Sequence, residues 1–299
     1  MQKIINTEKR NPASINIDIV STKEIINIIN KEDFKVAESI KKEHDKIEQA
    51  VDMISEAFLQ GGNLLYFGAG TSGRLGVLDA SECPPTFGVS PEMVRGYIAG
   101  GDKALRTAVE GAEDSFDSGV SDLLNSCAKS NDVVAGISAS GNAPYVLGVL
   151  SKARDLNIKT IAIACNKEAK IKKLSDVFIC PEVGEEVITG STRMKSGTAQ
   201  KMILNMLSTA SMIKIGKTYE NFMVDVQPTN SKLKDRAARI VSEIADITYQ
   251  EAQDLLEKSN YRVKPAIVMS LLNLSYNETE KILKKHNGRL RDTLMDKTK

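Results

Sequence analysis

The chain has 299 residues, and its 40 lysines and arginines nearly balance its 39 aspartates and glutamates. A chain of this length fits one large α/β domain with a small added module. A balanced charge gives no long-range attraction to nucleic acid or to an acidic membrane surface. We therefore expect a small-molecule partner, with no nucleic acid and no membrane.

The sequence also argues against export and against a metal site. It contains no run of about 18 apolar residues, and residues 1–10 lack the apolar segment of a signal peptide. The four cysteines show no CxxC spacing, and the two histidines, His44 and His286, lie far apart. We expect a cytoplasmic protein without metal or cofactor.

The first part of the chain has a helical pattern. Residues 21–60 carry apolar side chains at helical spacing and end at Gly61 and Gly62. This pattern predicts one or two amphipathic helices, which form an N-terminal helical arm over residues 1–60.

From Asn63 the pattern changes to short apolar runs that alternate with helical segments. The runs lie at residues 64–67, 94–98, 133–137, 160–164 and 177–180. Five buried strands with helical crossovers predict an α/β fold with a doubly wound, five-stranded parallel sheet. We assign this sheet to a domain over residues 61–235.

The last third of the chain is helical again. Residues 191–215 fit one long helix that Ser191 and Thr192 can cap. After Asn230 the chain becomes helical and charged, and we predict a three-helix bundle as a separate domain over residues 236–299.

A glycine-rich loop follows the first predicted strand. It reads GAGTSGR over residues 68–74, and a helical pattern follows it. Ligands of open α/β sheets bind at the carboxyl ends of strands, and a helix N-terminus presents free N–H groups to an anion. We predict that Thr71, Ser72 and Gly73 bind a phosphate. The same glycines also fit the GxGxxG pattern of a dinucleotide site.

A second loop of this kind follows the third predicted strand. It reads SASGN, and its candidate ligand-binding residues are Ser138, Ser140, Gly141 and Asn142. Two hydroxyl-rich loops at adjacent strand ends favour a sugar phosphate over a dinucleotide. The alternative is that both are ordinary strand-to-helix turns with capping serines.

The paired GTSGR and SASGN loops resemble the SIS fold of phosphosugar-binding proteins. Longer motifs are more specific: LDASECPPTFG at 78–88, IAGG at 98–101, VEGAEDS at 109–115 and GSTRMKSGTAQK at 190–201. Together they are similar to the N-acetylmuramic acid 6-phosphate etherases over nearly the whole chain. The resemblance implies cleavage of a D-lactyl ether to N-acetylglucosamine 6-phosphate and D-lactate in cell-wall amino sugar recovery. It also implies a homodimer with substrate near its interface.

The resemblance further implies acid/base roles for Glu82 and Glu113. Removal of the C2 proton next to an aldehyde allows the C3 lactyl ether to leave, and water then adds back. Two carboxylates can divide the acid and base tasks if their surroundings separate their pKa values. No motif contains a histidine, so glutamates are the natural candidates.

Helical geometry gives each glutamate an expected place. Glu113 would border an apolar helical stripe between Leu105 and Phe116 and be half-buried, whereas an ordinary glutamate there would be solvated. Glu82 would end a helix that starts near Ser72, because Pro84 follows it. Ten helical residues span about 15 Å, more than a hexose phosphate needs. Glu82 would then reach across a dimer interface, or its helix would break midway, near residue 76.

The motif GSTRMKSGTAQK at 190–201 supplies further binding candidates. Ser191, Thr192 and Lys195 could hold the lactyl carboxylate, the phosphate or the enolate oxygen, since a helix N-terminus and an ammonium both favour negative charge. The alternative is a helix cap beside a solvated lysine.

Two other functions fit the same fold. One is a non-catalytic sugar-phosphate sensor similar to the glucokinase regulatory protein, and the other is an aldose–ketose sugar-phosphate isomerase. A binding module would not need both glutamate motifs, and released D-lactate would separate the etherase from both alternatives.

Overall fold

The computed structural model describes residues 6–228 and 230–296. Its contacts divide the chain into two compact units. The sheet unit consists of Met1–Ser81 and Glu92–Thr209, and the helical unit consists of Glu82–Pro91 and Ala210–Lys299. The three functional domains predicted above, 1–60, 61–235 and 236–299, stay a prediction.

The sheet unit contains the five parallel strands that the sequence predicts. They are β1 (Leu64–Gly68), β2 (Val94–Ile98), β3 (Val133–Ile137), β4 (Lys159–Ile163) and β5 (Val177–Ile179), in the order β2-β1-β3-β4-β5. Every residue of β1 and β3 is buried, as their continuous apolar runs require. Gly68 pairs with Ile98 and with Ile137, so these three strands end at one edge of the sheet.

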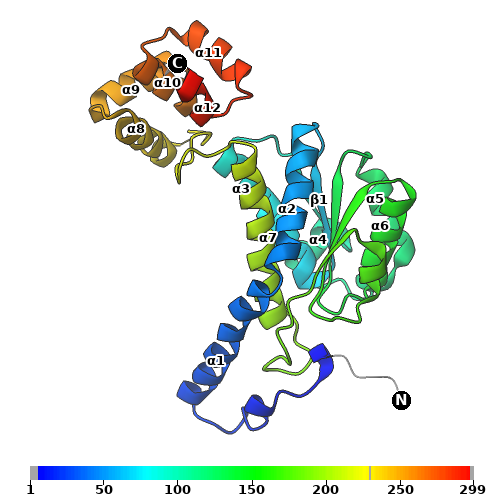
Figure 1. The fold of residues 1–299 in the computed structure, drawn as a ribbon. Helices are drawn as coiled ribbons and strands as arrows, with labels where there is room; N and C mark the ends of the chain where they lie inside the picture. The colour runs from blue at the N-terminus through cyan, green and yellow to red at the C-terminus, as the bar shows by residue number, and fades with distance from the viewer. Residues whose placement is uncertain (1–5, 229, 297–299) are drawn as a thin grey trace. The chain divides into compact units, whose positions relative to one another are not determined.

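Helices cover both faces of the sheet, which confirms the doubly wound fold (Figure 1). On one face α5 (Phe116–Asn125) packs on α6 (Pro144–Asp155), and on the other α2 (His44–Leu59) contacts the strands. The remaining helices are α3 (Gly70–Phe87), α4 (Gly101–Arg106) and α7 (Lys195–Lys214), with short 3-10 turns η1 (Asn6–Glu8), η2 (Pro12–Ser14), η3 (Ala112–Asp114) and η4 (Lys170–Leu174).

The N-terminal arm contains α1 (Thr22–Lys41) in addition to α2, in agreement with the sequence. Ser21 begins α1, because its Oγ accepts a hydrogen bond from the Glu24 N–H. α1 extends away from the sheet in Figure 1 and leaves large apolar side chains exposed, with Phe34 73% accessible.

In its described residues the helical unit contains five helices where the sequence predicted three. They are α8 (Ser231–Ala245), α9 (Tyr249–Lys258), α10 (Val263–Leu272), α11 (Tyr276–Lys285) and α12 (Leu290–Met295), packed around one apolar core. The prediction was wrong because tight turns divide the pattern. Asp246 and Asn273 adopt left-handed conformations, and capping boxes at Thr248 and Ser275 start the next helices. Among the described residues, every helix is too short or too polar to cross a membrane.

Candidate active site

The phosphate loop predicted after β1 forms the start of α3. The helix begins at Gly70, two residues before the predicted start, so Thr71, Ser72 and Gly73 lie in its first turn. The Gly73 N–H donates to the Ala69 carbonyl, whereas the Thr71 and Ser72 amides precede this first helical bond. These amides have no side-chain cap in the described part of the chain, which makes this terminus a site for an anion.

Glycine is required where strand and helix approach each other. A Cβ on Gly73 would stand 2.6 Å from Ile98 Cγ1 and 2.7 Å from the Gly68 carbonyl oxygen. A Cβ on Gly68 would stand 2.7 Å from the Gly73 nitrogen. The two glycines therefore hold the first turn of α3 against the ends of β1 and β2.

A pocket of about 170 Å³ joins this helix start to Glu113. Its wall contains Ala69, Gly70, Arg74, Ala99, Ala104, Ala108, Val109, Glu110, Gly111, Ala112 and Glu113. Arg74 is held in place because its Nη2 and Nε donate to the carbonyls of Ala104 (2.7 Å) and Leu105 (3.2 Å). The structure thus brings one predicted catalytic carboxylate to Gly70 and Arg74 of the predicted phosphate loop, whereas Thr71, Ser72 and Gly73 do not line this pocket.

The predicted surroundings of Glu113 were wrong. Glu113 is exposed and lies in η3, outside any α-helix. α4 ends at Arg106, and Gly111 adopts a left-handed conformation with φ of 73°. The apolar residues between 105 and 116 therefore lie in a turn, and they do not form a helical stripe that buries the carboxyl group.

The second loop lies beside the first, because β3 pairs with β1. The Gly141 N–H donates to Ser138 Oγ (3.1 Å), and the Asn142 N–H donates to Ser140 Oγ (3.3 Å). Both serine oxygens accept, so within the described residues their hydroxyl protons remain available to a ligand. Gly141 has a φ of 68°, and a Cβ there would stand 2.2 Å from Ala169 Cβ.

The motif at residues 190–201 does not start a helix at Ser191 as predicted. α7 begins at Lys195, and Ser191 and Thr192 lie in the turn before it. The fully buried Glu186 caps this terminus: its Oε2 accepts from the Lys195 N–H (2.9 Å) and its Oε1 from the Ser196 N–H (2.9 Å). Sequence reasoning missed this cap because Glu186 lies nine residues before the helix.

Lys195 is buried in an ion pair, so the alternative of a solvated lysine is wrong. Its Nζ lies 2.6 Å from Glu32 Oε2 of α1, and its side chain is 1% exposed. Burial raises the pKa of Glu32, but hydrogen bonds from Lys195, Lys35 and Asn11 outweigh it and lower that pKa to about 2. The ammonium stabilises the arm, and it does not line the pocket of Glu113.

The starts of α3 and α7 meet at two points. A Cβ on Gly197 would stand 3.3 Å from Thr71 Cγ2, and Ser72 Oγ donates to Gln200 Oε1 at 2.9 Å. Gln200 is 1% exposed, and its Nε2 has no partner in the described chain. The sequence analysis did not single out Gln200, and only its place in the motif at residues 190–201 could have indicated it.

Glu82 is exposed and lies inside α3, not at its end as predicted. Pro84 and Pro85 stand in the last helical turn, which the Gly88 N–H closes by donating to the Pro84 carbonyl. α3 also continues past residue 76, so the predicted break there was wrong. Along the axis Glu82 lies about 18 Å from Gly70, outside the pocket that Gly70 and Glu113 line.

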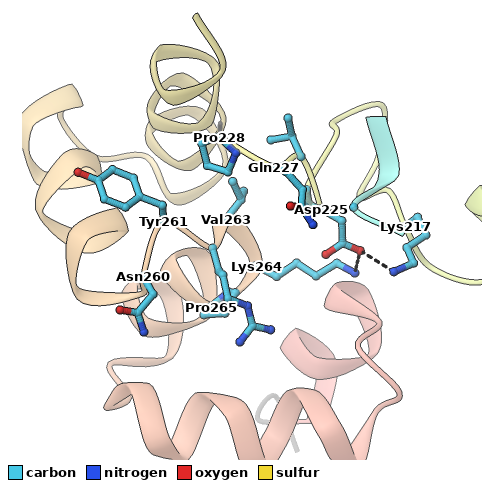
Figure 2. Close-up of a pocket in the computed structure, with 13 residues that line it drawn as sticks. Lys217, Asp225, Gln227, Pro228, Asn260, Tyr261, Val263, Lys264 and Pro265 are labelled. Atoms are coloured by element: carbon cyan, nitrogen blue, oxygen red, sulfur yellow. Dashed lines mark hydrogen bonds and ion pairs between the residues drawn. The ribbon is translucent and has the colours of Figure 1, made fainter. Parts of the chain in front are cut away.

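A larger cavity of about 460 Å³ lies within the helical unit (Figure 2). Lys264 Nζ donates to Asp225 Oδ2 (2.6 Å) and to the Gly216 carbonyl (2.9 Å), while Lys217 Nζ lies 3.6 Å from the same carboxylate oxygen. Burial lowers the pKa of Lys264, and Asp225 opposes this shift. None of the predicted site residues lines this cavity. Its charges bind one another and join the loop after α7 to α10.

Family models and a solved structure agree with this fold. Residues 45–154 match the glucokinase regulatory protein N-terminal SIS domain, residues 114–210 the SIS domain, and residues 220–278 the C-terminal lid domain of glucokinase regulatory protein. A phosphoheptose isomerase from Francisella tularensis has a TM-score of 0.51 and 19% identity, and the match covers 65% of this chain and 100% of that one. The fold and the paired loops define an SIS-domain protein.

Curated relatives narrow the class to one family. The N-acetylmuramic acid 6-phosphate etherase of Oceanobacillus iheyensis is 55% identical over 89% of this chain and 90% of its own length. N-acetylmuramic acid 6-phosphate etherase 2 of Vibrio cholerae is 54% identical over 89% of this chain and 86% of its own length. The chain belongs to the N-acetylmuramic acid 6-phosphate etherase family.

Proposed function

We propose that this chain is a lyase that cleaves the D-lactyl ether of N-acetylmuramic acid 6-phosphate with water. The products are N-acetylglucosamine 6-phosphate and D-lactate, and the reaction serves the recovery of cell-wall amino sugars. The identity of 55% to an etherase over 89% of the chain carries the proposal. The pocket that joins Glu113 to the first turn of α3 supports it.

The phosphate binds between the two loops at the edge of the sheet. The amides of Thr71 and Ser72 face an incoming anion at the start of α3, and the hydroxyl groups of Ser138 and Ser140 can donate from the neighbouring loop. The dinucleotide alternative lacks support, because the second loop adds hydroxyl donors to the amides of the first loop.

The chemistry needs a base at C2 and an acid at the ether oxygen. Loss of the C2 proton from the open-chain aldehyde and cleavage of the C3–O bond give a C2–C3 double bond and lactate, which takes up a proton. Water then adds its hydroxyl to C3 and its proton to C2. Glu113 performs one of the two proton transfers, since it lines the pocket at the phosphate loop.

The second carboxylate comes from the partner's Glu82 in a homodimer. Within one α3 the distance from Gly70 to Glu82 is about 18 Å, too long for one sugar phosphate. The arm supplies an apolar surface for a second copy, since Ile19, Ile26 and Phe34 are exposed by 78%, 59% and 73%.

Mixed dimers test this arrangement. Glu82→Gln and Glu113→Gln subunits, each inactive alone, are expected to regain lactate release when they are mixed, because one site of the mixed dimer then holds both glutamates. No recovery, with mixed dimers verified by mass, would show that both carboxylates act within one subunit.

The other site and domain assignments are also proposals. Ser191 and Thr192 lie beside the start of α7 and could bind the lactyl carboxylate. The arm (1–60) would build the dimer, residues 61–235 would catalyse, and residues 236–299 would form a separate helical domain. We place the reaction in the cytoplasm, because a sugar phosphate anion does not cross a bilayer unaided.

Incubation with N-acetylmuramic acid 6-phosphate in heavy-oxygen water tests the proposed function. Elimination and hydration predict released D-lactate and label at C3 of the sugar. The matches to domains of the glucokinase regulatory protein keep a non-catalytic sensor as the second candidate. Binding of the sugar phosphate without lactate release would favour that sensor.

A further inference from the structure

The side-chain amide of Gln200, at the start of α3, has a hydrogen-bond partner for only one of its two polar atoms. Its Oε1 accepts a hydrogen bond from Ser72 Oγ at 2.9 Å, while its buried Nε2 has no partner in the described part of the chain. Ser72 is 7% exposed and Gln200 is 1% exposed. A buried N–H group without a partner is rare and costly, so it calls for a physical reason.

The direction of this hydrogen bond decides what Ser72 can do. A serine hydroxyl has one proton, and here that proton points to Gln200. Ser138 and Ser140 differ, because their oxygens accept backbone N–H groups and keep their protons. In the present arrangement Ser72 cannot donate to a phosphate oxygen.

We propose that Gln200 is a positioning residue that switches the Ser72 hydroxyl when a phosphate binds. The side-chain amide turns over, its Nε2 donates to Ser72 Oγ, and the Ser72 proton is donated to a phosphate oxygen. This rotation of the amide gives the buried Nε2 a partner and leaves Oε1 unpaired. A buried carbonyl oxygen without a hydrogen bond is less unusual than a buried N–H group without one. The inference rests on the proposed function, because it needs a sugar phosphate at this loop.

A purely structural role would look different. The bond between Ser72 and Gln200 joins α3 to α7 beside the contact of Thr71 with Gly197. For that task either direction of the bond is sufficient, and a glutamate at position 200 would accept as well as the amide does. The proposed switch requires a side chain that can both accept and donate.

A double-mutant cycle tests the switch. The affinity for N-acetylglucosamine 6-phosphate is measured by calorimetry for the wild type, Gln200→Glu, Ser72→Ala and the double variant, with thermal unfolding to verify folding. We expect Gln200→Glu and Ser72→Ala each to weaken binding about tenfold or more, since each removes a hydrogen bond to a charged group. The double variant should bind no more weakly than Ser72→Ala, and KM for lactate release should change more than kcat.

Two results would overturn the inference. Wild-type affinity in Gln200→Glu would leave Gln200 a structural role only. An equal further loss from Gln200→Glu in the Ser72→Ala background would show that the new charge repels the phosphate directly. Failure of the proposed function looks different, since the wild type would then bind the sugar phosphate without releasing lactate from the substrate. If the wild type binds no sugar phosphate, both the proposed function and the proposed role of Gln200 are wrong.

Discussion

The N-termini of α3 and α7 in the sheet unit have similar sequences but different surroundings. The start of α3 contains Thr71 and Ser72, and its first amides have no side-chain cap among the described residues. The start of α7 follows Ser191 and Thr192, yet the buried Glu186 already occupies it. A helix N-terminus can bind an anion only when no internal carboxylate has taken its place.

The largest expected effect concerns the site at the start of α3. Replacement of Glu113 by glutamine should lower kcat for lactate release about 10²–10⁴-fold, because it removes a general acid or base. Affinity for N-acetylglucosamine 6-phosphate should change little. Asp114→Asn is the matched control, since Asp114 is exposed and does not line the pocket. Activity of Glu113→Gln equal to that of the control would remove Glu113 from the chemistry.

Removal of the cap on α7 should destabilise the fold. Glu186→Ala leaves the Lys195 and Ser196 amides and the Ser196 hydroxyl without their acceptor, so we expect a loss of about 3–5 kcal/mol in the free energy of unfolding. Urea denaturation measures this loss. Glu185→Ala at the neighbouring position is the control and should cost less than about 0.5 kcal/mol. Equal stability of the two variants would mean that the start of α7 needs no internal anion.

Acid should release the ion pair that holds Lys195. Against the raising effect of burial, hydrogen bonds from Lys195 and Lys35 lower the pKa of Glu32 from its ordinary value of 4.5 to about 2 in the folded protein. A lowered pKa stabilises the fold above pH 4.5, and the contribution is lost as the pH falls from about 4.5 to 2. Glu32→Gln should flatten the decrease in stability over this range, whereas Glu38→Gln, an exposed position of α1, should not. An unchanged decrease in Glu32→Gln would contradict the buried pair.

The smallest expected effect is a difference in stability between alanine substitutions at Gly73 in α3 and Gly197 in α7. Gly73→Ala should cost about 1–3 kcal/mol of stability and weaken sugar phosphate binding, because the new Cβ would collide with Ile98 and with the Gly68 carbonyl. For Gly197→Ala the new Cβ would stand 3.3 Å from the Thr71 methyl group and at an ordinary contact distance of 3.6 Å from the Thr192 carbonyl oxygen, and better helix propensity offsets the closer contact. Equal costs, measured by denaturation and calorimetry, would show that both helix starts are packed equally tightly.

The sequence predicts what local patterns determine. Short runs rich in apolar residues predicted all five strands, and the rule that ligands bind at strand ends predicted a role for the glycine-rich loops after β1 and β3. The place of Glu113 could not be predicted in the same way. α4 ends at Arg106, where Thr107 is extended, and Gly111 then adopts a left-handed conformation; periodicity reveals neither change.

Contacts between distant residues account for the remaining errors. Glu186 replaces Ser191 as the cap of α7, and Glu32 binds Lys195 from a helix 163 positions away in sequence. Gln200 reaches Ser72 across 128 positions. Such pairs form only when the sheet has brought their helices together, so motif spacing alone could not assign them.

The structure of the complex with N-acetylglucosamine 6-phosphate tests the central comparison most directly. We predict that the phosphate lies within hydrogen-bond distance of the Thr71 and Ser72 amides at the start of α3, with Glu113 facing the sugar and Glu186 still capping α7. A phosphate bound at the Lys195 and Ser196 amides, with Glu186 displaced, would contradict the assignment of the two helix starts.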